Sequence, residues 1–267
     1  MLHPAYTIIL APNPSMMTGP GTNTIVLGGG VEGATVIDPA DDNRDHLEAI
    51  IQEGAKRGGI RCVLITHGHP DHVGGAKILC KELRISIYGF SRAGFSEIDE
   101  EVPDSMIFPA GDDALRAVYT PGHRFDHLGY YLEGRRTLFA GDLVASVGTV
   151  VIAPPEGDML DYFNSLKRLQ SMDLAEMVPS HGPVITDPQA KIAEYIAHRL
   201  QREQQVSTVL HSFPFGATID AMVQSIYADV DPRLHPVAAK SVEAHLLKLE
   251  REGRVQHGDN NTWTLKN

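Results

Sequence analysis

The chain has 267 residues, of which 42% are hydrophobic, 21% charged and 6% aromatic. This length allows one large domain or a large and a small one, and the composition excludes a disordered or fibrous protein. Lys and Arg number 23 against 34 Asp and Glu, and the formal charge of −11 argues against a surface built to coat nucleic acids.

The first two thirds of the sequence predict short strands and helices that alternate without the regularity of a doubly wound sheet. Runs of β-branched residues between glycine-rich turns, and wholly apolar runs, predict the strands. Strands are expected at residues 7–10, 24–27, 34–37, 62–65, 85–88, 115–119, 127–132, 137–140 and 176–178. Apolar positions with helical spacing predict helices at residues 43–57, 73–83, 160–169 and 188–211.

After the helix predicted at 188–211, the sequence predicts a separate group of short elements. Thr218 is a suitable N-cap for one helix, and Pro236 suits the start of another. Residues 254–257 and 262–265 then predict a hairpin around Gly258-Asp259-Asn260-Asn261. Helices followed by a terminal hairpin outline a winged helix. The predicted domains are therefore a catalytic domain at 1–210 and a winged-helix-like domain at 211–267.

The strongest chemical signal is Thr66-His67-Gly68-His69-Pro70-Asp71-His72, directly after the apolar strand at 62–65. A strand end brings several side chains to one place, and neutral imidazoles with a carboxylate suit zinc or a similar metal. A polar surface loop is the plain alternative, but three His and one Asp within six positions rarely arise by chance. The segment therefore predicts a metal site at His67, His69, Asp71 and His72.

Three further segments each place one such residue beyond a strand. His123 ends Thr120-Pro121-Gly122-His123, Asp142 follows Ala140-Gly141, and His181 lies in Ser180-His181-Gly182-Pro183. Each of these residues alone is more often a structural group. Together and in this order they extend the predicted metal site.

The motif H-x-H-x-D-H, followed by T-P-G-H, G-D and H-G-P, resembles that of the metallo-β-lactamase-fold hydrolases. Within them the chain is similar to the β-lactamase-like protein 2 group, through residues 17–24, 161–166, 180–183 and 195–199 and the terminal winged-helix unit. The resemblance covers essentially the whole chain. It implies an α/β fold, the αββα sandwich, in which helices cover two sheets and the metals lie at one edge.

The resemblance also implies two metal ions. His67, His69 and His123 would hold the first ion, Asp71, His72 and His181 the second, and Asp142 would bridge them. Zinc is the expected metal, although iron or manganese also suits mixed His and Asp ligands. Two close cations lower the pKa of a shared water, which supplies a hydroxide nucleophile at neutral pH. Asp71 is expected to orient this nucleophile, and Asp142 to fix the separation of the metals.

Two substrate classes remain open. One is a small ester or thioester, as in glyoxalase II-like enzymes, and the other is single-stranded RNA, which the β-lactamase-like protein 2 resemblance implies. From residue 201 onward, seven basic and eight acidic residues give a net charge of −1. A module that grips phosphates is normally basic, so the ester or thioester is favoured. β-Lactam hydrolysis is a lesser alternative, because true β-lactamases of this fold usually lack the bridging Asp.

Arg124, His198 and Arg199 are the candidates for substrate binding, since a guanidinium can hold a carboxylate or phosphate. A solvated helix face and a partly buried packing histidine are the plain alternatives. Other histidines are expected to have no role, with His127 at the start of a strand. The histidines expected at the surface are His46, His235, His245 and His257.

The expected compartment follows from what the sequence lacks. Residues 1–6 show no signal-peptide pattern, no apolar run approaches the roughly 20 residues of a membrane helix, and only Cys62 and Cys80 occur. We therefore expect a cytoplasmic zinc-dependent hydrolase whose partner is a small acyl substrate or RNA, with no membrane partner and with a homodimer left open. A metal-binding scaffold without hydrolysis is the alternative outside the enzymes.

Overall fold

The computed structural model describes residues 5–258 and 261–266, so Asp259 and Asn260 of the predicted hairpin turn lie outside the described residues. In this part of the chain, no helix combines the length and apolar character needed to cross a membrane. The chain forms two compact units. The first unit contains residues up to 120, 126–149 and 171–191, and the second contains 121–125, 150–170 and the residues from 192 onward.

The first unit is built on two sheets. The first sheet has six strands, antiparallel from β1 to β3 and parallel from β3 to β6. These strands are β1 (Tyr6–Leu10), β2 (Asn23–Gly28), β3 (Ala34–Ile37), β4 (Ile60–Leu64), β5 (Ser86–Gly89) and β6 (Glu100–Glu101). The very short β6 has two glutamates and no β-branched residue, which is why the sequence did not predict it.

The second sheet has five strands in the order β11-β10-β9-β8-β7; β10 and β11 pair in parallel, and the other neighbours are antiparallel. These are β7 (Ile107–Ala110), β8 (Asp113–Tyr119), β9 (Leu128–Leu132), β10 (Thr137–Gly141) and β11 (Glu176–Pro179). Apolar side chains of both sheets form one buried core, in which Leu27 and Leu64 join Leu115 and Phe139. The predicted two-sheet sandwich is therefore confirmed, because sheets packed face to face bury such a shared layer.

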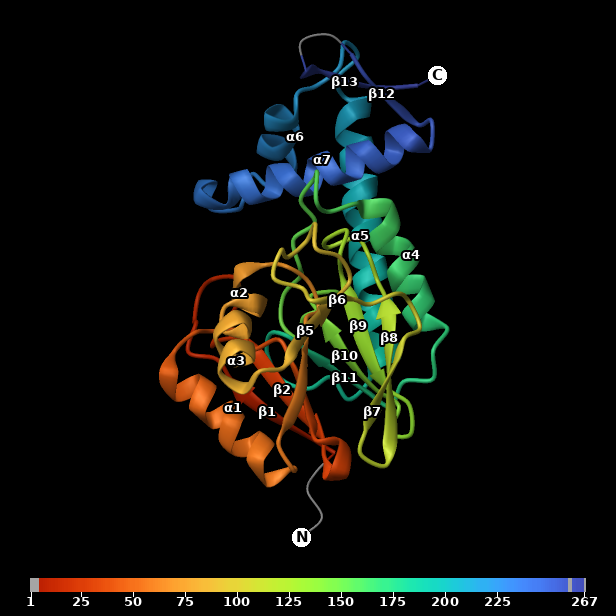
Figure 1. Cartoon of the computed structure of the whole chain (residues 1–267). Helices are drawn as coiled ribbons and strands as arrows, with labels where there is room; N and C mark the ends of the chain where they lie inside the picture. Colours follow the sequence, from red (N-terminus) through yellow and green to blue (C-terminus); the bar gives the residue numbers. More distant parts are fainter. Residues whose placement is uncertain (1–4, 259–260, 267) are drawn as a thin grey trace. The chain divides into compact units, whose positions relative to one another are not determined.

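Helices cover the other face of the first sheet. In Figure 1, α1 (Arg44–Lys56) and α3 (Ala76–Leu83) lie along strands of this sheet. Leu47 and Ile50 of α1 and Leu79 of α3 pack with strand residues in a second buried cluster. The side chain of Asn43 caps α1 by accepting hydrogen bonds from two backbone amides of the first turn. The first sheet is thus buried on both faces.

The helix predicted at 73–83 is confirmed over residues 76–83, but it begins later than predicted. The structure has a short α2 (Pro70–Val73), a break, and then α3. At the break, a Cβ on Gly74 would lie 2.6 Å from the carbonyl oxygen of Ala40, and one on Gly75 would lie 2.5 Å from that of Asp41. Only glycine permits this close approach of two backbones, and the approach ends the first helix.

The second unit contains α4 (Met159–Gln170), most of α5 (Pro188–His211), α6 (Ile219–Ile226), α7 (His235–Arg251), and the paired strands β12 (Val255–His257) and β13 (Trp263–Leu265). Its apolar core joins Leu210 of α5, Met222 of α6, Leu246 of α7 and Trp263 of β13. The Thr218 side chain accepts a hydrogen bond from the amide of Ala221, as expected for an N-cap. The predicted winged-helix outline is confirmed, whereas the domain boundary near residue 210 stays a prediction.

Two histidines that the sequence placed at the surface are buried. His46 is 4% exposed and His245 is 1% exposed. His245 lies three residues after Val242 and four before Leu249, so it belongs to the apolar stripe of α7. Neither ring nitrogen of His245 has a hydrogen-bond partner among the described residues. Burial, together with the positive charges of Arg199 and Lys248, lowers the pKa of His245 to about 3.

The His245 environment predicts a pH dependence of stability. The ring stays neutral in the folded protein but gains a proton near its ordinary pKa of 6.5 in the unfolded chain. The free energy of unfolding should therefore fall as the pH drops from about 6.5 toward 3, by up to about 1.4 kcal/mol per pH unit. His245→Leu should remove this component, as measured by urea denaturation at pH 7 and pH 5. The control His211→Leu alters an exposed histidine, and an equal pH slope in both variants would contradict the prediction.

Candidate metal centre

The histidine-rich loop begins where β4 ends. The amide of Ile65 still donates to the carbonyl of Tyr88 on the neighbouring strand, and the carbonyl of Thr66 accepts from the amide of Leu128 in the second sheet. His69 has an extended backbone and directly precedes α2, whose first residue is Pro70. The loop is therefore anchored to both sheets at its start and ends in a helical turn.

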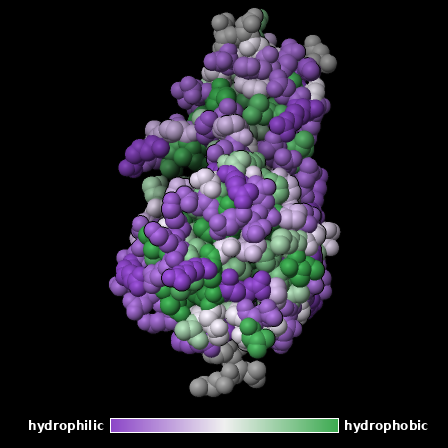
Figure 2. Space-filling model, in the orientation of Figure 1, coloured by the Kyte–Doolittle hydropathy of each residue, from purple (hydrophilic) through white to green (hydrophobic). Residues whose placement is uncertain are grey.

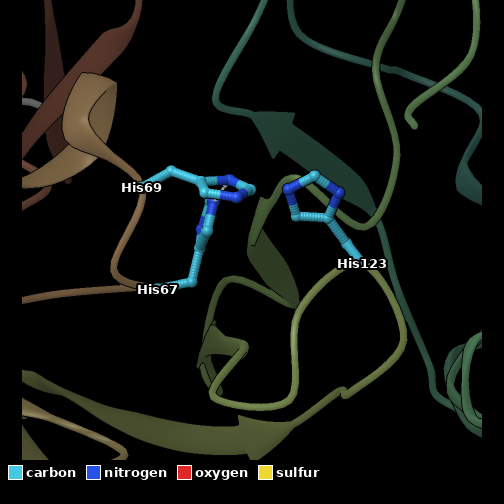
Figure 3. Close-up of side chains that lie close together, drawn as sticks. All are labelled: His67, His69 and His123. Atoms are coloured by element: carbon cyan, nitrogen blue, oxygen red, sulfur yellow. Dashed lines mark hydrogen bonds between the residues drawn. The ribbon is translucent and has the colours of Figure 1, made fainter. Parts of the chain in front are cut away.

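Seven predicted ligands come together in three groups. Within each group, one ligand atom per residue lies within 4.8 Å of the others. The groups are His67, His69 and His123; His67, His72 and Asp142; and Asp71, His72 and His181. Figure 3 shows the rings of His67 and His69 converging, with Nε2 of His67 2.8 Å from Nδ1 of His69. Segments far apart in the sequence thus supply each group.

Four ligand atoms meet around His72 and His181. The distance from His72 Nε2 is 3.6 Å to Asp142 Oδ1 and 3.8 Å to Asp71 Oδ2. The distance from His181 Nε2 is 3.3 Å to Asp142 Oδ1 and 3.5 Å to Asp71 Oδ2. Ligands about 2 Å from a tetrahedral zinc ion lie roughly 3.3 Å from one another, so these separations fit one metal ion.

His72 also shows the chemistry of a metal ligand. Its ring is fully buried, and its Nε2 has no hydrogen-bond partner among the described residues. Burial alone would lower the pKa of His72, but the carboxylates of Asp142 and Asp38 outweigh it and raise this pKa well above its ordinary value. The pKa of His181 is raised in the same way, chiefly by Asp142. Surroundings that favour a positive charge suit a divalent cation, and mixed nitrogen and oxygen ligands suit zinc, iron or manganese.

The sequence analysis missed Asp38, which orients His72. The Asp38 carboxylate is 2.8 Å from Nδ1 of His72 and accepts hydrogen bonds from the amide and hydroxyl of Thr66 at 2.7 and 2.6 Å. Because a carboxylate only accepts, Nδ1 carries a proton, and Nε2 is the ring atom that would bind a metal in exchange for a proton. Asp38 follows β3, whose last residue pairs with Leu64 of β4. This parallel pairing was the signal that could have identified it.

His127, to which the sequence assigned no role, orients Asp142. Its Nε2 accepts a hydrogen bond from the amide of Asp142 at 3.0 Å, and its Nδ1 lies 2.8 Å from the hydroxyl of Thr120. A Cβ on Gly141 would lie 2.4 Å from the same Nε2, and Gly141 has a φ of 56°. Glycine at this position therefore lets the backbone approach His127 and present Asp142.

His181 is held by a contact from the start of β2. The Asn23 side-chain amide donates to the carbonyls of Pro179 and Gly182, at 2.9 Å in both cases. The Asn23 backbone amide donates to the carbonyl of Ser180 at 2.7 Å. The turn that carries His181 is thus fixed on both sides of the ligand.

His123 lies in the short segment 121–125 after β8. Its Nδ1 donates to the carbonyl of Val151 at 2.8 Å, so Nδ1 carries the proton of the neutral ring. The neighbouring Gly122 packs so closely that a Cβ there would lie 2.3 Å from the Cα of Tyr162. The segment that carries His123 is therefore tightly held.

The predicted substrate-binding residues have protein contacts of their own. Arg124 is 6% exposed, and its Nη1 lies 2.9 Å from the Glu156 carboxylate. Arg199 is 3% exposed, donates to the carbonyl of Val150 and lies over the ring of Tyr162. His198 is half-buried, and burial lowers its pKa. Their role in substrate binding stays a prediction.

Comparisons with known proteins show which family the chain is similar to. A family model described as "Metallo-beta-lactamase superfamily" matches residues 17–181, and one described as "Beta-lactamase associated winged helix domain" matches residues 218–263. A "Beta-lactamase-like protein 2 homolog" of Drosophila melanogaster is 35% identical, and the match covers 93% of this chain and 88% of the relative. An "Atrochrysone carboxyl ACP thioesterase" of Aspergillus chevalieri is 32% identical over 94% of this chain and 83% of its own length.

A solved structure shares the fold over the whole chain. The crystal structure of a metallo-beta-lactamase family protein from Thermus thermophilus has a TM-score of 0.81, and the match covers 100% of both chains at 19% identity. The likeness shows that both parts of this chain, the two-sheet core and the terminal winged helix, occur together in a known fold.

The contact between Asp38 and His72 predicts an effect on metal affinity. Asp38→Asn keeps the side-chain shape but removes the charge that orients the imidazole, so zinc affinity should fall about 10- to 100-fold. Competition with a chromophoric chelator measures this affinity. Asp173→Asn is the control, because the Asp173 side chain is 75% exposed. Unchanged zinc affinity in Asp38→Asn would show that Asp38 does not support the metal site.

Proposed function

Because this chain belongs to the metallo-β-lactamase superfamily and carries its associated winged-helix domain, we propose that it is a two-metal hydrolase of esters or thioesters. The observation that carries the proposal is the convergence of the imidazoles of His72 and His181 with the carboxylates of Asp71 and Asp142, at nitrogen–oxygen separations of 3.3 to 3.8 Å. Asp142 also belongs to the group of His67 and His72, so one carboxylate can reach two ions.

We assign the seven ligands to two ions. His67, His69 and His123 would hold one ion and Asp71, His72 and His181 the other, and the Asp142 carboxylate lies near ligands of both sets. The three imidazoles of the first set and the mixed second set suit zinc, and iron and manganese are compatible with both. When bound by these residues, such ions would supply a lowered pKa of coordinated water and polarisation of a substrate carbonyl.

The side chains around the ions have distinct tasks. Asp71 is the most open of the carboxylates, with 30% of its side chain exposed, so one of its oxygens can hold an attacking water and accept its proton. Asp142 is 13% exposed, and His127 fixes its backbone. We therefore assign the transfer of the proton to the more exposed Asp71, and the spacing of the two ligand sets to Asp142.

An ester or thioester fits the charge of the protein better than RNA does. The formal charge of −11 repels a polyanion, whereas an acyl group meets no such barrier. A relative that aligns over most of the chain is named as a thioesterase. Single-stranded RNA and β-lactams are therefore the competing substrates in the test.

The proposal predicts a specific pattern of turnover. Zinc-loaded protein should hydrolyse S-lactoylglutathione and leave a single-stranded RNA and a β-lactam intact, and a chelator should abolish the activity. Asp142→Ala removes the shared ligand, so the thioesterase rate should fall at least about 100-fold with little change in the circular dichroism spectrum. Release of thiol, gel analysis of RNA and β-lactam absorbance are the measurements.

Asp173→Ala is the control, because Asp173 is exposed and absent from the three ligand groups. Chelator-sensitive RNA cleavage that Asp142→Ala abolishes would instead assign the protein to the ribonucleases. Bound zinc without turnover of any substrate would assign it to the metal-binding scaffolds.

A further inference from the structure

Arg199 differs from the charged residues of the protein surface. On the face drawn in Figure 2, hydrophilic residues surround small separate groups of hydrophobic ones, as is usual where charged side chains reach water. Arg199 is instead 3% exposed. Burying a charge costs free energy unless the surrounding groups compensate for the lost water, so the contacts of Arg199 indicate its task.

Two other buried arginines have carboxylate partners. Arg57 and Arg124 each lie 2.9 Å from a carboxylate oxygen, that of Glu53 and that of Glu156. In the part of the chain that the structure describes, Arg199 has no carboxylate within ion-pair distance, and its Nε has no hydrogen-bond partner. Arg199 is therefore not held in place by an ion pair with these residues.

One contact of Arg199 lies beside the hydrogen bond that orients His123. The Nη2 of Arg199 donates to the carbonyl of Val150 at 2.5 Å. The next carbonyl in the chain, that of Val151, accepts from Nδ1 of His123 at 2.8 Å. Two consecutive carbonyls thus connect the guanidinium to the imidazole.

The segment with these two carbonyls has little support from backbone pairing. Residues 150–152 belong to no helix or strand, and none of them makes a backbone–backbone hydrogen bond to another described residue. The buried side chain of Ile152 anchors one end of the segment. The peptide unit after the Val150 carbonyl is planar, so the bond from Arg199 also restricts where the Val151 carbonyl points.

A second contact of Arg199 leads to the residue before His123. The guanidinium carbon lies 5.3 Å from the centroid of the Tyr162 ring, a favourable cation–π arrangement. A Cβ on Gly122 would lie 2.3 Å from the Cα of Tyr162, so these two backbones touch. Segment 121–125, residues 150–170 and Arg199 all belong to the second unit. Arg199 therefore contacts both structures that support His123.

We propose that Arg199 is a positioning residue for His123: it fixes the Val150–Val151 segment, and the Val151 carbonyl thereby sets the rotation of the His123 imidazole. This inference rests on the proposed assignment of His123 to the metal site. A guanidinium suits the task because it is planar, always charged and able to stack on a ring while it donates. A positioning residue acts before any substrate arrives, which distinguishes this role from substrate binding.

The test measures zinc affinity without substrate, by competition with a chromophoric chelator. Arg199→Leu removes the donor, so the affinity for one of two zinc equivalents should fall about 10-fold, while Arg199→Lys keeps a charged donor and should recover most of this loss. Arg202→Leu is the matched control on the same helix. Arg202 lies over the ring of Tyr227 and donates to Gln205, so its loss should leave the zinc affinity unchanged.

A double-mutant cycle separates positioning from a general loss of structure. His123→Ala should weaken the binding of the same zinc equivalent more strongly than Arg199→Leu does. In the His123→Ala background, Arg199→Leu should change the affinity less than about twofold, because Arg199 acts through His123. An equal loss in both backgrounds would overturn the inference. If Arg199→Leu does not fold by circular dichroism, the shorter and uncharged Arg199→Gln replaces it in the cycle with the same expected result.

The remaining outcomes keep the two proposals apart. A raised KM in Arg199→Leu with unchanged zinc affinity would overturn the inference and assign Arg199 to substrate binding. Unchanged zinc affinity in His123→Ala would overturn the assignment of His123 to the metal site, and the inference with it. The zinc titration needs no turnover, so failure to hydrolyse any thioester, with the expected pattern of zinc affinities, would overturn the proposed function alone.

Discussion

The buried carboxylate of Asp38 is the constraint on which the metal centre depends. Asp38 is 1% exposed, and its oxygens hold the amide and hydroxyl of Thr66 and the ring of His72. A charge buried so deeply is tolerated only with such partners. The end of β3, the loop after β4 and the start of α2 are therefore fixed to one another. Every ligand from His67 to His72 takes its position from this attachment.

Electrostatics connect this arrangement to the substrate. The carboxylates of Asp142 and Asp38 raise the pKa of His72 against the effect of burial, and those of Asp142 and Asp71 do the same for His181. The same field attracts a divalent cation and opposes an approaching polyanion. The overall charge of −11 is the reason why the proposed substrate is a neutral acyl group rather than a polyanion.

The sequence predicted the site residues that lie close together in the chain. It missed the residues that reach the site only through the pairing of distant strands. The metal motif was recognisable because His67, His69, Asp71 and His72 are near neighbours in the chain. Asp38 and His127 were missed because they act on residues 34 and 15 positions away, through contacts that only the paired sheets create. The helix expected at 73–83 begins only at Ala76, after two glycines that lie close to another backbone segment. The amino-acid composition of this segment does not reveal that close approach.

The bonds of Asn23 imply an order of assembly. Its side chain holds the carbonyl of Pro179, 156 positions later, and thereby fixes the turn with His181. During synthesis, the histidine-rich loop emerges long before this turn. At that stage its imidazoles are present, but the predicted set of metal ligands is incomplete. We therefore expect that all seven predicted ligands can bind a metal only after β2 and β11 have taken their positions in the two sheets. A metal ion held by all of these ligands would therefore stabilise a chain whose strands are already paired.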